Sequence, residues 1–238
     1  MRSLATAMIL AAGRGERMRP LSDTLPKPLL CAGGKSLIAW QIEALARAGF
    51  RDIAINVAHG ADQMIAALGD GDAFGVRIAW SREAEPLETA GGIATASPLL
   101  APGPALIVSG DVWTRFDYAS LRPRFEAMRT IAASRSSRVH LVMVPNPPYH
   151  ADGDFALAGE RVESDGPVRL TFGNIGVYDT ALFRELQHGV KLRMLPLYRE
   201  WIRLGIVSGE RYDGPWANIG TPADLAALDT ALARNATG

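Results

Sequence analysis

Hydrophobic and polar positions along the chain form blocks that predict strands followed by helices. Short apolar runs bounded by glycine or polar residues are typical of buried strands, whereas apolar positions three or four apart indicate a helix. Leu37, Ile38, Ile42 and Leu45 have the helical spacing, with Ser36 at the N-cap position. We therefore expect strands at 7–12, 52–58, 76–80, 105–108 and 141–144, and helices at 36–48, 62–68, 194–204 and 222–234.

The repeated order of strand, helix and strand predicts an α/β protein. We expect a Rossmann-like mixed, mostly parallel sheet with helices on both faces, and ligands at the carboxyl ends of its strands. Prolines and glycines separate short strand-like pieces over 145–178, which indicates a small antiparallel lid beside the main sheet. No internal repeat or long linker interrupts residues 1–238, so one domain with this lid as a subregion is favoured. The polar stretch 134–138 is interpreted as a solvated surface loop.

Composition and charge narrow the class of protein. Lys and Arg together number 25, as do Asp and Glu, so the formal net charge is zero and no basic surface for nucleic acid is predicted. No apolar run reaches the 18 or more residues that a membrane helix requires, and the first one leads into a charged glycine loop. We therefore expect a soluble, cytoplasmic protein. Cys31 is the only cysteine, so no intrachain disulfide is possible, and we expect it to be a small buried hydrophobe.

The most informative stretch is the loop after the first apolar run. Ala11 and Ala12 end the run, and residues 13–30 combine two glycines with three arginines and the sequence Pro-Lys-Pro. Glycine lets backbone N–H groups approach an anion, and guanidinium groups bind phosphate oxygens through paired donors. Lys27 lies between two prolines, so a stiff segment presents its ammonium group as a point charge for a second phosphate. The loop predicts a polyphosphate ligand, with Gly13, Gly15 and Arg17 at the phosphates.

Other phosphate-binding motifs do not fit this loop. The dinucleotide pattern G-x-G-x-x-G requires a third glycine where Met18 stands, and the chain has no G-x-x-x-x-G-K-[ST] sequence typical of P-loop ATPases. A flavodoxin-like or dinucleotide-binding module would also have no use for Pro-Lys-Pro. An ordinary strand-to-helix turn explains Gly13 and Gly15 alone, but not the arginines and the lysine that accompany them.

A carboxylate follows the buried strand at 105–108. Asp111, at the end of Ser-Gly-Asp, would bind Mg²⁺ as a hard oxygen ligand if it faced a triphosphate. Capping of a turn or a helix is the alternative role for an aspartate in this position. Because Gly13, Glu83 and Asp111 all follow predicted strands, one crevice can collect them.

These residues give the chain its resemblance to a known family. Its N-terminal segment is similar to the pattern G-x-G-x-R-(M/L)-x-P-L, followed by P-K-P-L, of the sugar-1-phosphate nucleotidyltransferases. Within that family the chain most resembles the N-acetylmuramate-1-phosphate uridylyltransferases of peptidoglycan recycling. The similarity continues through 83–93, 109–114, 150–155, 173–178 and 216–225.

The resemblance implies a site for UTP, a sugar 1-phosphate and Mg²⁺. Glu83, Glu88 and Thr89 match the segment that contacts uracil, and Asp111 matches the metal aspartate. Asn218 stands where the family usually has a second metal aspartate; its amide oxygen can ligate Mg²⁺ but carries no charge. The implied catalytic residues are Arg17, Lys27 and Asp111. The implied nucleotide-binding residues are Ala11, Ala12, Gly13, Gly15, Glu83, Glu88 and Thr89. The implied sugar-binding residues are Gly153, Asn174 and Asp154, for which a turn-forming role is equally open.

The expected reaction requires no general base, because the attacking sugar-phosphate oxygen is already ionised at pH 7. We expect in-line attack on the α-phosphorus of UTP and release of pyrophosphate. One alternative is a guanylyl- or cytidylyltransferase that acts on another hexose or heptose 1-phosphate. Another is a non-catalytic nucleotide-sugar-binding regulator, which the uncharged Asn218 would favour. Nucleic-acid and membrane partners are not expected, and monomer or weak dimer remains open.

Overall fold

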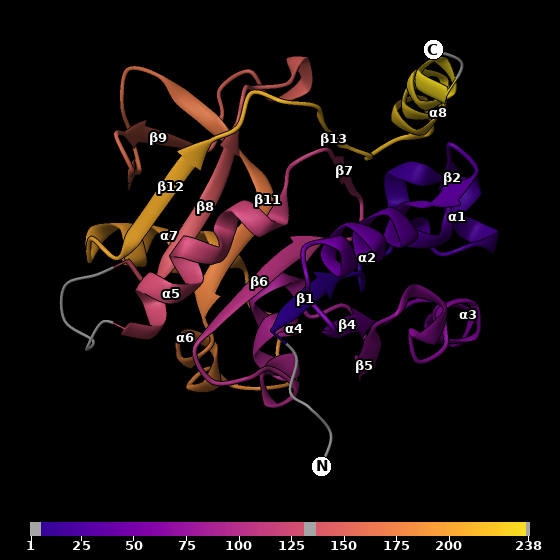
Figure 1. Ribbon diagram of the computed structural model, residues 1–238, viewed down its shortest axis with the longest axis horizontal. Helices are drawn as coiled ribbons and strands as arrows, with labels where there is room; N and C mark the ends of the chain where they lie inside the picture. Colours follow the sequence, from indigo (N-terminus) through magenta and orange to yellow (C-terminus); the bar gives the residue numbers. More distant parts are fainter. Residues whose placement is uncertain (1–5, 131–136, 237–238) are drawn as a thin grey trace.

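The computed structural model describes residues 6–130 and 137–236 of the chain. Its centre is a mixed sheet of nine strands (Figure 1). Its strand order is β5-β4-β1-β6-β11-β8-β12-β10-β9. The first four strands are parallel, and β11 runs antiparallel to both β6 and β8. The strands are β1 (Ala7–Leu10), β4 (Asp52–Val57), β5 (Arg77–Arg82), β6 (Pro104–Ser109), β8 (Val139–Val144), β9 (Phe155–Ala158), β10 (Arg161–Glu163), β11 (Arg169–Asp179) and β12 (Val207–Arg211).

Helices cover both faces of this sheet, as the alternating pattern predicts. Along β1, Ala7 and Ile9 pack on one face and Met8 on the other, because successive strand residues point to opposite sides. Helices α2, α3 and α5 contribute apolar side chains to the first face, and α4, α6 and α7 to the second. The helices are α1 (Leu21–Thr24), α2 (Leu37–Arg47), α3 (Ala61–Leu68), α4 (Glu88–Ala96), α5 (Arg122–Thr130), α6 (Ala181–Arg184), α7 (Met194–Arg203) and α8 (Pro222–Ala236).

The elements expected from the pattern are present, with small shifts at their ends. The Ser36 hydroxyl accepts a hydrogen bond from the Ala39 N–H at 3.3 Å, which confirms the predicted N-cap of α2. β1 ends at Leu10, so Ala11 and Ala12 already belong to the following loop. Residues 134–136 of the expected surface loop lie outside the described residues.

The expectation of a lid beside the main sheet over 145–178 requires a correction. β9 and β10 do form an antiparallel pair, but they extend the main sheet, and β11 lies near its centre between β6 and β8. β11 is missed by the pattern because Gly173, Asn174 and Gly176 interrupt its apolar positions. Its register shifts against β8 between Phe172 and Gly176, so these residues form a bulge.

Two short ribbons hold loops at the carboxyl edge of the parallel strands. β7 (Val112–Thr114) pairs with β13 (Trp216–Asn218), so Asn218 lies opposite Val112, and the Ile219 N–H donates to the Asp111 carbonyl at 2.9 Å. β2 (Cys31–Ala32) pairs with β3 (Lys35–Ser36). Cys31 is exposed rather than buried as expected, because Ala32 is the residue of β2 that faces the core.

A third, smaller core anchors the loop that follows β1. Met18 is fully buried there against α2 and α8, together with Leu37 and Leu228. The loop is therefore tied to the body of the protein through its apolar residues.

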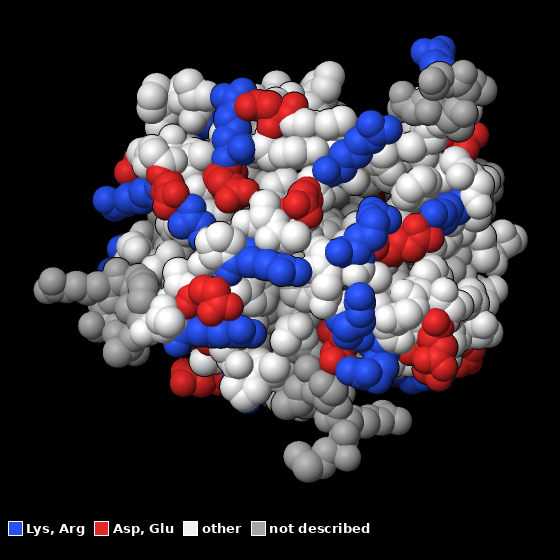
Figure 2. Space-filling model, viewed as in Figure 1, with Lys and Arg blue, Asp and Glu red and all other residues white. Residues whose placement is uncertain are grey.

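Charges of both signs are mixed over the face of the molecule in Figure 2. This mixture agrees with the zero net charge, and it does not produce the single-sign field that binds a polyanion on this face. Over residues 6–130 and 137–236, the structure contains no helix that is both long and apolar enough to cross a membrane.

Candidate active site

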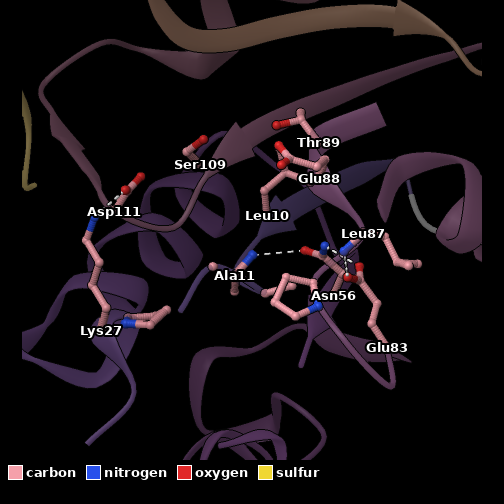
Figure 3. Close-up of a pocket in the computed structure, with 14 residues that line it drawn as sticks. Leu10, Ala11, Lys27, Asn56, Glu83, Leu87, Glu88, Thr89, Ser109 and Asp111 are labelled. Carbon is pink, nitrogen blue, oxygen red and sulfur yellow. Dashed lines mark hydrogen bonds and ion pairs between the residues drawn. The ribbon is translucent and has the colours of Figure 1, made fainter. Parts of the chain in front are cut away.

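The carboxyl ends of the four parallel strands surround one cavity of about 340 Å³. This volume is within the range of small-molecule sites. Every parallel strand contributes to the site, directly or through the loop that follows it, as the predicted fold requires. The predicted residues that line the cavity are Ala11, Ala12, Gly13, Lys27, Glu83, Glu88, Thr89 and Asp111, and Leu10, Pro28, Asn56, Pro86, Leu87 and Ser109 complete the wall (Figure 3).

The two glycines of the phosphate loop differ in their surroundings. A Cβ added to Gly13 would meet no atom of the described residues within 4 Å, so this residue leaves open space at the cavity wall. Gly15 has a φ of 64°, and a Cβ there would lie 2.9 Å from Cβ of Lys27. Gly15 is thus needed both for its left-handed backbone and for the close approach of the segment that carries Lys27.

Lys27 and Asp111 form an ion pair in the wall of the cavity. The Lys27 Nζ lies 2.5 Å from Asp111 Oδ2, and their side chains are 10% and 30% exposed (Figure 3). Lys27 lies in the short 3₁₀ helix η2 (Lys27–Leu29), and Asp111 in the turn between β6 and β7. The structure therefore brings together the two charged groups that the sequence assigns to a phosphate and to a metal ion.

A buried hydrogen-bonded brace forms the other end of the cavity. Asn56 accepts a hydrogen bond from the Ala11 N–H at 2.9 Å and donates one to Glu83 Oε1 at 2.7 Å (Figure 3). The second oxygen of Glu83 accepts from the Leu87 N–H at 3.0 Å. Burial raises the pKa of the Glu83 carboxyl, and both hydrogen bonds oppose that rise. The brace therefore fixes the loop after β1 against the loop after β5.

Sequence reasoning did not find Asn56. Its signal is the one polar residue in the buried part of strand β4, and such a residue needs hydrogen-bond partners. Gly92 of α4 is also part of this arrangement, since a Cβ there would lie 2.7 Å from Asn56 Nδ2 and 2.9 Å from Glu83 Oε1. The helix can approach the brace only because residue 92 has no side chain.

The start of α4 presents two predicted base-contacting residues to the cavity. Glu88 is the first residue of the helix and has a φ of 63°, which is uncommon for a residue with a side chain. Glu88 and Thr89 are both exposed and project on the same side of the cavity (Figure 3). Within the described parts of the chain no side chain caps α4, so the alternative role of Thr89 as an N-cap is not observed.

Arg17 and Asn218 do not line this cavity. Arg17 instead packs against the segment that follows Asn218. A Cβ on Gly220 would lie 3.3 Å from Nη2 of Arg17, so the guanidinium group packs on the backbone that follows β13. Asn218 Oδ1 is buried and, among the described residues, accepts no hydrogen bond. The hydrogen bond from the Ile219 N–H to the Asp111 carbonyl brings the backbone next to Asn218 close to the backbone of Asp111.

Tyr149 belongs to the same region and was not predicted. It lies in η6 (Pro148–His150) and lines, with Asn218 and Asp224, a groove of about 490 Å³. Burial raises the pKa of the Tyr149 hydroxyl, and Asp224 adds to the rise, while Asn218 and Arg17 oppose it. The hydroxyl is therefore close enough to sense charged groups from several elements.

Of the predicted sugar-side residues, Asn174 lies in the middle of β11, and Gly153 and Asp154 lie beside the first half of this strand. Ile175 pairs with Val108, so Asn174 is beside the end of β6 that leads to Asp111. Asn174 has a φ of 56° within the bulge, a conformation that asparagine tolerates better than most residues. Both carboxylate oxygens of Asp154 are already engaged, one by the Phe172 N–H at 2.8 Å and one by His150 at 3.1 Å. Gly153 packs against Asn146, where a Cβ would lie 2.8 Å from Oδ1.

Comparison with known proteins identifies the family. The sequence profile of the nucleotidyl transferase family matches residues 6–146, more than half of the chain. The chain belongs to the nucleotidyl transferase family. It is 47% identical over 223 residues to N-acetylmuramate alpha-1-phosphate uridylyltransferase of Neisseria meningitidis, covering 92% of this chain and 94% of that one.

More distant matches of this nucleotidyl transferase include a guanyltransferase and a solved structure. A mannose-1-phosphate guanyltransferase of Emericella nidulans is 31% identical over 233 residues, covering 92% of this chain and 62% of that protein. The crystal structure of HddC from Yersinia pseudotuberculosis complexed with GMP-PN superposes with a TM-score of 0.75, at 19% identity, and covers 96% of this chain and 99% of that one. That likeness confirms the predicted α/β fold.

In this nucleotidyl transferase, the predicted residues other than Gly15 fall into three groups. One lines the cavity of about 340 Å³, one comprises Arg17 and Asn218, and one comprises Gly153, Asp154 and Asn174. The first group follows from the parallel strands, while the other two depend on the pairing of β13 with β7 and of β11 with β6.

Proposed function

We propose that the chain transfers a uridylyl group from UTP to N-acetylmuramic acid 1-phosphate, forming the UDP-sugar and pyrophosphate. The identity of 47% over 92% of the chain with the Neisseria uridylyltransferase is the observation that carries this proposal. The crevice supports it, because a glycine loop, a lysine and an aspartate at one edge of the sheet suit two phosphate-bearing substrates.

UTP is proposed to occupy the cavity between the phosphate loop and α4. The base lies toward Glu88 and Thr89, while the triphosphate lies toward Gly13, Gly15 and Arg17. Glu83 acts as a positioning residue through Asn56 and Leu87, since its carboxylate oxygens already accept hydrogen bonds from these residues. Ala11 joins this loop to the brace through its N–H, and Ala12 lines the cavity.

A divalent metal ion, proposed to be Mg²⁺, is held by Asp111 and Asn218. Members of this family generally use a divalent metal. The residues fit such an ion, because Asp111 offers a hard anionic oxygen and the buried Asn218 Oδ1 has no protein partner in the described part of the chain. The ion would neutralise charge on the reacting phosphates. No cluster of three His, Cys, Asp or Glu side chains that could hold a metal ion occurs in the described part of the chain, so phosphate oxygens and water would complete the coordination.

The sugar 1-phosphate is proposed to lie between Lys27 and the β11 bulge. Lys27 holds its phosphate, Asn174 donates to a sugar hydroxyl or amide group, and Gly153 and Asp154 shape the turn beside it. A phosphate monoester is largely dianionic at pH 7, so the nucleophile needs no proton acceptor. Its oxygen forms a bond to the α-phosphorus of UTP while the bond from that phosphorus to the bridging oxygen of pyrophosphate breaks. The protein supplies alignment of two anions and positive charge around them.

The test is a turnover screen read by pyrophosphate release. Each common nucleoside triphosphate is combined with N-acetylmuramic acid 1-phosphate, N-acetylglucosamine 1-phosphate and mannose 1-phosphate. We expect the highest kcat/KM for UTP with the first sugar. N-acetylglucosamine 1-phosphate is the matched control, since it lacks only the lactyl ether. Preference for GTP or CTP with another sugar would support the alternative of a guanylyl- or cytidylyltransferase. No turnover with any pair would support the alternative of a non-catalytic regulator that binds nucleotide sugars.

A further inference from the structure

Lys27 and Asp111 neutralise each other in the site where the proposed function needs both of them. The ammonium nitrogen is 2.5 Å from one carboxylate oxygen, and the Lys27 side chain is only 10% exposed. Among the described residues neither group has a second ion-pair partner. Because little water reaches the ammonium group, this pair is screened less than an exposed one.

Rigid backbone holds both ends of this ion pair. Lys27 follows Pro26, whose φ is −50°, and the turn is closed by a hydrogen bond from the Leu29 N–H to the Pro26 carbonyl at 2.8 Å. On the other side, the Gly110 N–H donates to the Leu10 carbonyl at 2.9 Å, next to Asp111. Because the backbone on both sides is fixed, we expect the pair to open by rotation of the two side chains and not by movement of the segments that carry them.

The two roles proposed for this pair compete with each other. A divalent cation at Asp111 needs carboxylate oxygens that the ammonium group already partly neutralises, and it would lie next to a like charge. Asn218 cannot compensate, since its amide oxygen brings only a dipole. A phosphate that draws Lys27 away leaves the full charge of Asp111 available to the cation.

From this geometry we propose that Lys27 is the internal counter-ion of Asp111, and that transfer of its ammonium group to the acceptor phosphate strengthens metal binding. The inference rests on the proposed function for the identity of the acceptor. The acceptor and the cation then bind with positive coupling, and by linkage each raises the affinity for the other by the same factor.

The first experiment measures Mn²⁺ binding to the nucleotide-free, phosphate-free full chain, by calorimetry or by the paramagnetic resonance of free Mn²⁺. We expect Lys27→Gln to bind Mn²⁺ at least tenfold more tightly than the wild type, because Asp111 is released. Lys27→Arg keeps a cation beside Asp111 and should bind weakly, like the wild type. Lys35→Gln is the matched control, since Lys35 pairs with Glu43 at 2.6 Å away from the crevice. Equal affinities for the wild type and Lys27→Gln would overturn the proposal.

The second experiment measures the coupling itself. N-acetylmuramic acid 1-phosphate is added at saturation, and the factor by which it tightens Mn²⁺ binding is compared between the wild type and Lys27→Gln. We expect a larger factor in the wild type, since in the variant only direct ligation of the cation by phosphate remains. Equal factors would refute the transfer of Lys27. If the turnover screen fails but Lys27→Gln still tightens Mn²⁺ binding, the ion-pair role stands and the proposed acceptor is wrong.

Discussion

At the scale of single residues, the site depends on charged groups that are held by neutral neighbours. Gly15 has no side chain, which lets the Lys27 segment approach the phosphate loop, and Asn56 aligns Glu83 with Ala11. The Lys27 segment and the Glu83 carboxylate thus have defined positions before any substrate enters. Such preorganisation lowers the free energy needed to align two anionic substrates.

Lys27→Ala should impair use of the acceptor more than use of UTP. With its ammonium group removed, we expect the sugar-phosphate KM to rise or kcat to fall at least tenfold, about 1.4 kcal/mol. Steady-state kinetics with each substrate varied in turn, together with UTP binding by calorimetry, measure the two effects separately. Equal losses of affinity for both substrates would contradict the assignment of Lys27 to the acceptor.

Glu83→Gln should change how stability depends on pH. Burial raises the pKa of Glu83 in the folded protein above its ordinary value of 4.5, so the folded state binds this proton more readily than the unfolded state. The wild type therefore loses stability relative to the variant as pH rises from about 4.5 through the folded pKa. Urea unfolding of both proteins across this window measures the difference. Parallel profiles would show that Glu83 titrates as it does in the unfolded chain.

At the scale of elements, the loop after β1 combines a fixed part with an open part. Met18 is buried between α2 and α8, and Gly15 is packed against Lys27, whereas a Cβ on Gly13 would meet no described atom. Helix α4 is fixed in a similar way, since Gly92 lies directly on the Asn56–Glu83 brace. The elements that surround the cavity are therefore packed on their outer sides and open toward the ligand.

The substitutions Gly13→Ala and Gly15→Ala should differ in their effects on stability. Gly15→Ala forces a left-handed backbone on alanine and a contact with Lys27, so we expect a loss of more than about 1 kcal/mol in unfolding free energy. Gly13→Ala meets no atom of the described residues and should leave stability nearly unchanged while weakening UTP binding. Thermal unfolding and UTP titration of both variants are the measurements. Equal destabilisation by the two substitutions would show that Gly13 also has a packing role.

At the scale of the whole molecule, one sheet edge collects the site from distant parts of the chain. The four parallel strands contribute the cavity, the β7–β13 ribbon brings Asn218 toward Asp111, and the antiparallel β11 brings Asn174 to the same edge. Because these segments are joined through the sheet, a ligand at this edge contacts much of the folded structure, and its binding should stabilise the whole protein.

UTP with Mg²⁺ should raise the melting temperature, whereas Mg²⁺ alone should not. Ligand at 100 times its Kd adds about 2.7 kcal/mol, or roughly 5–10 °C for a chain of this size. Mg²⁺ alone is expected to bind poorly because Asn218 carries no charge and Lys27 neutralises Asp111. Asn218→Asp should strengthen metal binding in the nucleotide-free protein, as measured by calorimetry. Tight binding of Mg²⁺ to the wild type without UTP, or no response to Asn218→Asp, would contradict this account.

The sequence by itself determined the parallel part of the sheet and the residues at its carboxyl edge. Local periodicity indicates which segments are strands and helices, and parallel strands end at the same edge, so the chain's pattern alone groups Gly13, Glu83 and Asp111. Only the tertiary structure decided that Lys27 pairs with Asp111, that Asn56 braces Glu83, and that β11 lies inside the sheet. Those features depend on contacts between segments that are far apart in the chain. The role of each side chain is set there by its partner in space and not by its neighbours in sequence.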